Sequence, residues 1–126
     1  MTDGTKLFVL FGALSLAVAT AAGAAASHAL GSLDARALTM FETAVRFQFY
    51  HGLALLVVPL LRERFGRPLG ITIAAWAFVA GTLLFCGTLY ARALGAPPAL
   101  GSLAPIGGSA FILGWIALAV GVARGR

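Results

Sequence analysis

Residues 40–51 carry five side chains that could take part in chemistry: Glu42, Arg46, Gln48, Tyr50 and His51. They supply a carboxylate, a guanidinium, an amide, a phenol and an imidazole, which are groups that relay protons, pair with ions or bind metals. If the stretch is a helix that turns about 100° per residue, Glu42, Arg46 and Tyr50 share one face, and the other two lie elsewhere. The sequence therefore predicts a helix with two polar faces.

Glu42 and Arg46 stand four residues apart with the acid first, which is the spacing of an ion pair on one helix face. Ionisable groups at membrane depth are costly and often functional, so a proton or ion relay is the alternative. We favour an interfacial ion pair that closes the outer end of the protein, because the helix is long enough to carry both residues to headgroup level.

His28 and His51 are the two histidines of the chain and could together bind haem or a metal. Neither has Cys or carboxylate ligands at metal spacing, so the sequence favours structural roles and predicts no cofactor and no metal. We expect His51 to be buried between helices and bonded to a backbone carbonyl or to a neighbouring Thr or Tyr. His28 is expected to help close the turn after the first span.

The segment around Pro105, Gly107 and Gly108 could offer backbone N–H groups to an anion or a lipid headgroup, as helix N-termini do. The alternative is a tight helix start where glycines permit close contact. The chain contains no Ser-His-Asp arrangement, phosphate-binding loop or paired-carboxylate motif, so no catalytic residue is predicted.

The elements that carry these residues are predicted by composition. Of 126 residues, 60% are hydrophobic and 10% are charged, and the mean hydropathy is +0.97. This is more apolar surface than one small water-soluble core can bury. We predict an all-α integral membrane four-helix bundle, a single domain over residues 1–126 with spans at about 7–26, 43–61, 69–90 and 105–123.

Local signals refine these spans. Asp34 is placed to cap a second helix that begins near Ala35, and Ser102 is expected to cap the last helix. Residues 95–101 are too rich in Pro and Gly to be helical. Small residues recur every three or four positions in two spans, which predicts close helix contact at Ala13, Ala17, Ala21 and Ala25 and at Gly107, Ala110, Gly114, Ala117 and Gly121.

The formal net charge is +5, but the basic residues are scattered at the ends of segments, so nucleic acid is not an expected partner. If the N-terminus is inside, six basic residues face the cytoplasm and three face outward, which predicts that both termini are inside. The six are Lys6, Arg62, Arg64, Arg67, Arg124 and Arg126, and the three are Arg36, Arg46 and Arg92.

Four motifs follow one another along the chain: residues 23–30 (GAAASHAL), 41–51 (FETAVRFQFYH), 85–90 (FCGTLY) and 104–108 (APIGG), the last followed by LGW at 113–115. Together they resemble the YgdD/YwdK family of small four-helix membrane proteins. The resemblance implies a bacterial inner-membrane protein without an established biochemical activity. The sequence departs from the family pattern at two places. Ser27 stands where the family usually has Ala or Gly before its histidine, and Leu103-Ala104 stands where the family usually has Thr before the proline.

Three functions are compatible with these residues. The first, which we favour, is a structural or accessory membrane protein that contacts membrane lipids, a larger membrane-protein partner or further copies of itself. The second is a transporter or channel for a small solute, acting as an oligomer, although three of the predicted spans carry no charge. The third is a membrane haem or metal protein that uses His28 and His51.

Overall fold

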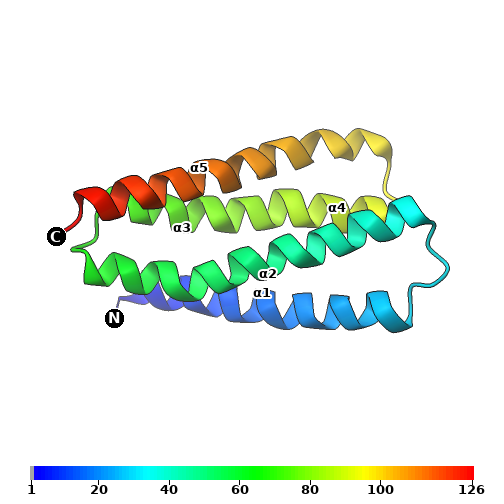
Figure 1. Cartoon of the computed structure of the whole chain (residues 1–126), viewed down its shortest axis with the longest axis horizontal. Coiled ribbons are helices and arrows are strands. Elements are labelled where there is room, and N and C mark those ends of the chain that lie inside the picture. Colours follow the sequence, from blue (N-terminus) through cyan, green and yellow to red (C-terminus); the bar gives the residue numbers. More distant parts are fainter. Residues whose placement is uncertain (1) are drawn as a thin grey trace.

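Four long helices make up the computed structural model, which describes residues 2–126 (Figure 1). The third and fourth are built from consecutive pieces. The elements are α1 (Asp3–His28), α2 (Ala35–Arg64), α3 (Leu69–Gly81), the π-helical η1 (Thr82–Cys86), α4 (Gly87–Ala93), the 3-10 helix η2 (Pro98–Ser102) and α5 (Leu103–Arg124).

Each of the four helices is long and apolar enough to cross a membrane, with 26, 30, 25 and 27 residues. At about 1.5 Å per residue, even the shortest exceeds a hydrocarbon core of about 30 Å. No strand occurs between residues 2 and 126, so the predicted all-α, four-span class is confirmed. The two termini lie at the same end of the bundle (Figure 1), while their placement inside the cell stays a prediction.

The start of α2 follows the sequence prediction. The carboxylate of Asp34 accepts a hydrogen bond of 2.8 Å from the N–H of Ala37, which satisfies one of the free donors of the first turn. The start of the last helix differs from the sequence prediction. Residues Pro98–Ser102 form a 3-10 helix that runs directly into α5, and the Ser102 hydroxyl donates to the carbonyl of Ala99 at 3.1 Å. The predicted Ser102 cap and the wholly non-helical loop are therefore wrong, because this stretch is already in helical turns.

The helices pack in the order α1, α2, third helix, α5, as Figure 1 shows. The third helix, α3–η1–α4, lies between α2 and α5, whereas α1 packs mainly on α2. Leu55 of α2 and Ile71 and Phe78 of α3 are completely buried and form the centre of the core. Beyond α2, α1 reaches the third helix through an edge contact between the rings of Phe8 and Trp76, 5.0 Å apart.

The small residues of α5 form the predicted contact surface against the third helix. A Cβ added at Gly114 would lie 2.7 Å from Phe78 Cε1, and one added at Gly121 would lie 2.7 Å from the backbone N of Ile71. Both distances are too short for real side chains. Only glycine permits this approach, which confirms the close packing expected of the series from Gly107 to Gly121.

The alanine series of α1 does not pack as predicted. Ala13 and Ala17 are exposed, and the buried face of α1 passes instead through Gly12, Ser15 and Ala19. A Cβ added at Gly12 would lie 2.9 Å from the carbonyl oxygen of Gly52. A glycine pair brings two backbones closer than alanines can, so the contact face lies roughly on the opposite side of α1 from the alanine series.

Candidate functional site

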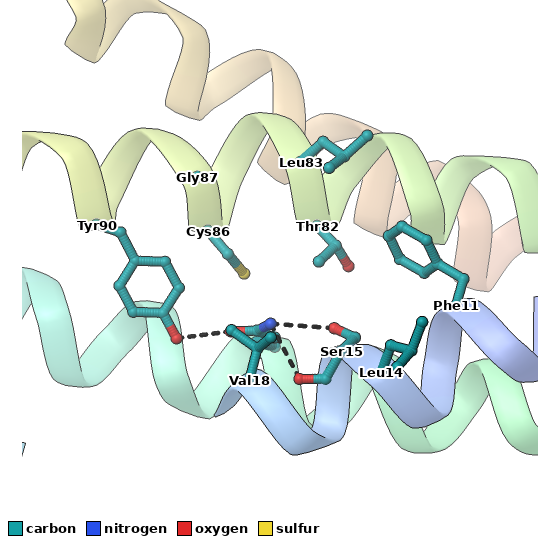
Figure 2. A pocket seen from close by; sticks show the side chains of 10 residues that line it. Phe11, Leu14, Ser15, Val18, Thr82, Leu83, Cys86, Gly87 and Tyr90 are labelled. Carbon is teal, nitrogen blue, oxygen red and sulfur yellow. Dashed lines mark hydrogen bonds between the residues drawn. The ribbon is translucent and has the colours of Figure 1, made fainter. Parts of the chain in front are cut away.

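Gln48 lies at the centre of a hydrogen-bond network that joins three helices (Figure 2). Its Nε2 group donates to the carbonyl oxygen of Ser15 at 3.0 Å and to the Ser15 hydroxyl at 3.1 Å. The hydroxyl of Tyr90 donates to Gln48 Oε1 at 2.6 Å. Both amide hydrogens of Gln48 therefore have acceptors, and side chains connect α1, α2 and α4, with Ser15 and Gln48 inside their predicted spans and Tyr90 at the end of the third.

The π-helical turn η1 determines where Tyr90 points. Thr82–Cys86 is wound with a wider turn than an α-helix, and such turns behave as single-residue insertions that are frequent at functional sites. One inserted residue changes the direction of every later side chain by about 100°. In Figure 2, Thr82, Cys86 and Tyr90 all point from the third helix toward α1 and α2, so the π turn aligns Tyr90 with the residues before it.

A groove of about 390 Å³ opens beside this network, between α1 and the third helix. Its rim is apolar and exposed: Leu14 is 67% exposed and Leu83 is 61% exposed. Thr82 adds no free donor, because its hydroxyl donates to the carbonyl of Phe78 at 2.8 Å. We call this cavity the Gln48 groove, and it is lined by Phe11, Leu14, Ser15, Val18, Gln48, Thr82, Leu83, Cys86, Gly87 and Tyr90.

His51 occupies a second buried polar position, about one turn further along α2, where it faces α3 and α5. Its Nδ1 lies 2.8 Å from the carbonyl oxygen of Phe47, and the indole N–H of Trp115 donates to its Nε2 at 3.0 Å. Tryptophan can only donate and a carbonyl can only accept, so Nδ1 carries the proton and Nε2 carries none. The ring also stacks on Phe111, with 3.6 Å between centroids. The predicted bond to a backbone carbonyl is confirmed, and the imidazole is neutral.

His28 lies far from His51. It is the last residue of α1 and is exposed, whereas His51 stands sixteen residues into α2, about 24 Å along the axis from the end where His28 lies. Both nitrogens of His51 are already bonded. Across residues 2–126, no three His, Cys, Asp or Glu side chains gather as metal ligands. The hypothesis of haem or metal binding by the two histidines together is therefore wrong.

The remaining members of the predicted polar cluster face outward. Glu42, Arg46 and Tyr50 are exposed, and Arg46 Nη2 donates to the hydroxyl of Thr43 at 3.4 Å. In the part of the chain that the structure describes, the ion pairs are made by Glu63 and do not include Glu42. The predicted Glu42–Arg46 ion pair is therefore wrong. Holding two long exposed side chains together costs conformational entropy that a well-solvated pair scarcely returns.

The candidate anion site near Pro105 is occupied by packing. Gly107 is buried and lies directly against the backbone of Phe85, and a Cβ added at Gly108 would lie 3.6 Å from the ring of Phe85. Helix α5 begins at Leu103, so the N–H groups of both glycines belong to the helix. These contacts support the close-contact alternative and give no support to an anion at this position.

A further polar cluster, at the end where the termini lie, was not predicted. Glu63 accepts hydrogen bonds from the Thr5 hydroxyl at 2.7 Å and from Arg67 Nε at 3.1 Å. Arg62 Nε donates to the Thr72 hydroxyl at 2.8 Å. The sequence analysis likewise missed the partners Ser15, Tyr90 and Trp115, although Ser15 is one of two hydroxyl residues in the first span and could have been matched to Gln48.

Comparisons with known proteins agree on one family. The sequence matches the family described as "Protein of unknown function (DUF423)" over residues 22–108, which is more than half of the chain. No solved structure matches.

Bacterial membrane proteins are among the most similar relatives. The UPF0382 membrane protein YwdK of Bacillus subtilis is 34% identical over 120 residues, covering 94% of this chain and 98% of the relative. The UPF0382 membrane protein SAB0533 of Staphylococcus aureus is 38% identical over 116 residues, covering 91% and 93%. A UPF0382 membrane protein of Haemophilus influenzae is 39% identical over 110 residues, covering 86% and 87%.

Proposed function

Because this chain belongs to the DUF423 family, whose description assigns no function, we propose its role from the geometry of the Gln48 groove. The proposed role is that of a structural or accessory protein of the bacterial membrane that holds a lipid acyl chain in this groove. The protein is a multi-pass membrane protein, as its four apolar helices and its relatives named as membrane proteins agree.

The observation that carries the proposal is the pairing of an apolar, outward-opening rim with polar groups that are already satisfied. Leu14, Val18 and Leu83 on the rim are all more than half exposed. At this depth the surrounding solvent is hydrocarbon, so an acyl chain meets this lining without a desolvation cost. A polar solute would have to compete with the bonds that Gln48 already makes to Ser15 and Tyr90.

An acyl chain in the groove would also have a structural effect. Helix α1 packs mainly on α2 and touches the third helix through few side chains, among them Phe8 and Trp76. A chain lying between α1 and α4 would fill the space between them with the contacts that a close-packed interior normally supplies. Lipid would then complete the bundle.

The same contacts weigh against the transporter alternative. A transport path needs polar groups that can exchange partners with a passing solute. The amide hydrogens of Gln48 and both ring nitrogens of His51 are engaged within the protein. A homo-oligomer or a larger membrane-protein partner remains a prediction that is compatible with the proposed role.

Photo-labelling tests the proposal with the purified protein in phosphatidylcholine vesicles that contain a lipid with a diazirine on its acyl chain. Gly87→Phe should fill the groove, because Gly87 lines it and an added Cβ there meets nothing within 4 Å. We expect labelling at Val18 and Leu83 to fall several-fold in this variant. The control, Ala13→Phe, places the same ring on an exposed part of α1 that faces away from the groove, and it should leave this labelling unchanged. Equal labelling of the groove in both variants would refute the proposal.

A further inference from the structure

A second cavity, of about 540 Å³, lies at the end of the bundle opposite the two termini. Residues 32–34 of the α1–α2 turn, three residues at the start of α2 and residues 92–95 at the end of α4 line it. Two of the lining side chains are arginines, Arg36 and Arg92. We call this cavity the arginine pocket, and it shares no lining residue with the Gln48 groove.

The positive charge of this pocket is not balanced within the protein. In residues 2–126, neither arginine makes an ion pair with a carboxylate, and Arg92 Nε is buried without a hydrogen-bond partner. Asp34 also lines the pocket, but its carboxylate already caps α2 through the N–H of Ala37. The pocket thus contains two guanidinium groups and one carboxylate, so its net charge is positive. A buried donor on a charged group is costly to leave unpaired, so the pocket is suited to an anion.

Arg92 packs on one side against the neighbouring 3-10 helix. A Cβ added at Gly101 would lie 3.2 Å from Arg92 Nη1, so η2 covers one side of the guanidinium at close range. An arginine that already packs against the protein loses less conformational freedom when it binds a ligand. It is therefore better prepared for binding than an arginine on a free surface.

The level of the pocket in the membrane indicates the kind of anion. Arg36 precedes the predicted second span, which begins near residue 43, and Arg92 follows the third, which ends near residue 90. Both are therefore expected at the depth of lipid headgroups. Leu33, Met40 and Leu94 line the rest of the pocket and provide an apolar surface beside the charges.

We propose that the arginine pocket binds a phosphate group, with Arg36 and Arg92 as its ligands. Guanidinium groups bind phosphate through pairs of N–H···O bonds, which are among the stronger hydrogen bonds in proteins. The phosphate can belong to the headgroup of an anionic membrane lipid or to a soluble phosphate compound. This site is independent of the acyl chain proposed for the Gln48 groove, because the two cavities have separate linings.

Binding measurements on the purified full-length protein in detergent test this site with two probes, short-chain phosphatidylglycerol and inorganic phosphate. We expect at least one of them to bind, and Arg36→Gln and Arg92→Gln each to raise its Kd about tenfold or more. The control, Arg46→Gln, removes an exposed arginine near the same end of the bundle that does not line the pocket, and it should leave the Kd unchanged.

The two probes distinguish the source of the phosphate. Binding of phosphatidylglycerol much tighter than inorganic phosphate identifies a lipid headgroup, and equal affinities identify a soluble phosphate compound. Arg36 is exposed, so Arg36→Gln tests the site even if Arg92→Gln does not fold. Absence of binding by both probes, or an unchanged Kd in Arg36→Gln, would overturn the proposal. Neither result depends on acyl-chain labelling of the Gln48 groove.

Discussion

Two adjacent glycines of α5 allow the helix contact to be tested with a single methyl group. Gly107 is buried against the backbone of Phe85, so an added Cβ meets the Phe85 N and Cβ atoms and the Leu84 carbonyl carbon. Gly108 points aside, and its Cβ would make an ordinary contact of 3.6 Å with the Phe85 ring. Gly107→Ala and Gly108→Ala therefore change the same helix in the same way and differ only in what the methyl group meets.

The expected difference follows from two effects. Alanine is favoured over glycine inside a helix by about 1 kcal/mol, and this gain applies to both variants. Overpacking costs about 1–3 kcal/mol, and it applies only at residue 107, where backbone atoms cannot rotate away as a side chain could. We expect Gly108→Ala to be neutral or slightly stabilising, and Gly107→Ala to be less stable than Gly108→Ala by about 1–3 kcal/mol.

Thermal or denaturant unfolding of both variants in one detergent measures this difference. Because helix propensity cancels between the two, the comparison isolates the contact between α5 and the third helix. Equal stability of Gly107→Ala and Gly108→Ala would show that the two helices do not approach as closely as described, and the reasoning on the small-residue face of α5 would fail.

Three further predictions concern the Gln48 network, the Glu42–Arg46 pair and the orientation in the membrane. Tyr90→Phe should cost about 0.6–1.7 kcal/mol of unfolding free energy, and almost nothing when Gln48→Leu is already present; equal losses in both backgrounds would contradict the network. The effects of Glu42→Gln and Arg46→Gln on thermal stability should add within about 0.5 kcal/mol, because no ion pair joins these residues, and a larger coupling would show that the pair forms in the membrane. A fluorescent protein fused after Arg126 should report from the cytoplasm, and activity of an externally folding reporter there would reverse the predicted orientation.

The fold class followed from quantities that the sequence states directly. Four apolar stretches of spanning length fixed the number of helices, and Asp34 marked the start of α2 because a cap depends only on neighbouring residues. The contact face of α5 was also readable, since Gly114 and Gly121 recur at helical spacing. Each of these features is local or periodic.

The candidate site depended on features that are neither local nor periodic. Gln48 and His51 were identified as polar residues of interest, but their partners Ser15, Tyr90 and Trp115 lie on other helices at sequence separations of 33, 42 and 64 residues. Which residues meet across helices depends on how each helix is rotated. The alanine series of α1 predicted a contact face roughly opposite to the one that packs, and no sequence pattern indicated the π turn.

Because of the π turn Thr82–Cys86, the number of residues in the third helix determines which way the side chains after the turn point. Deleting one residue there would restore an ordinary α-helix, which the backbone would tolerate well. The part before it, including Ile71 and Phe78, would keep its place in the core. Everything after it would rotate by about 100°, taking Tyr90 away from Gln48 and Arg92 away from its pocket. A deletion that barely changes hydropathy or helix content would thus give a chain that still inserts and folds but has lost the arrangement proposed to bind lipid and phosphate.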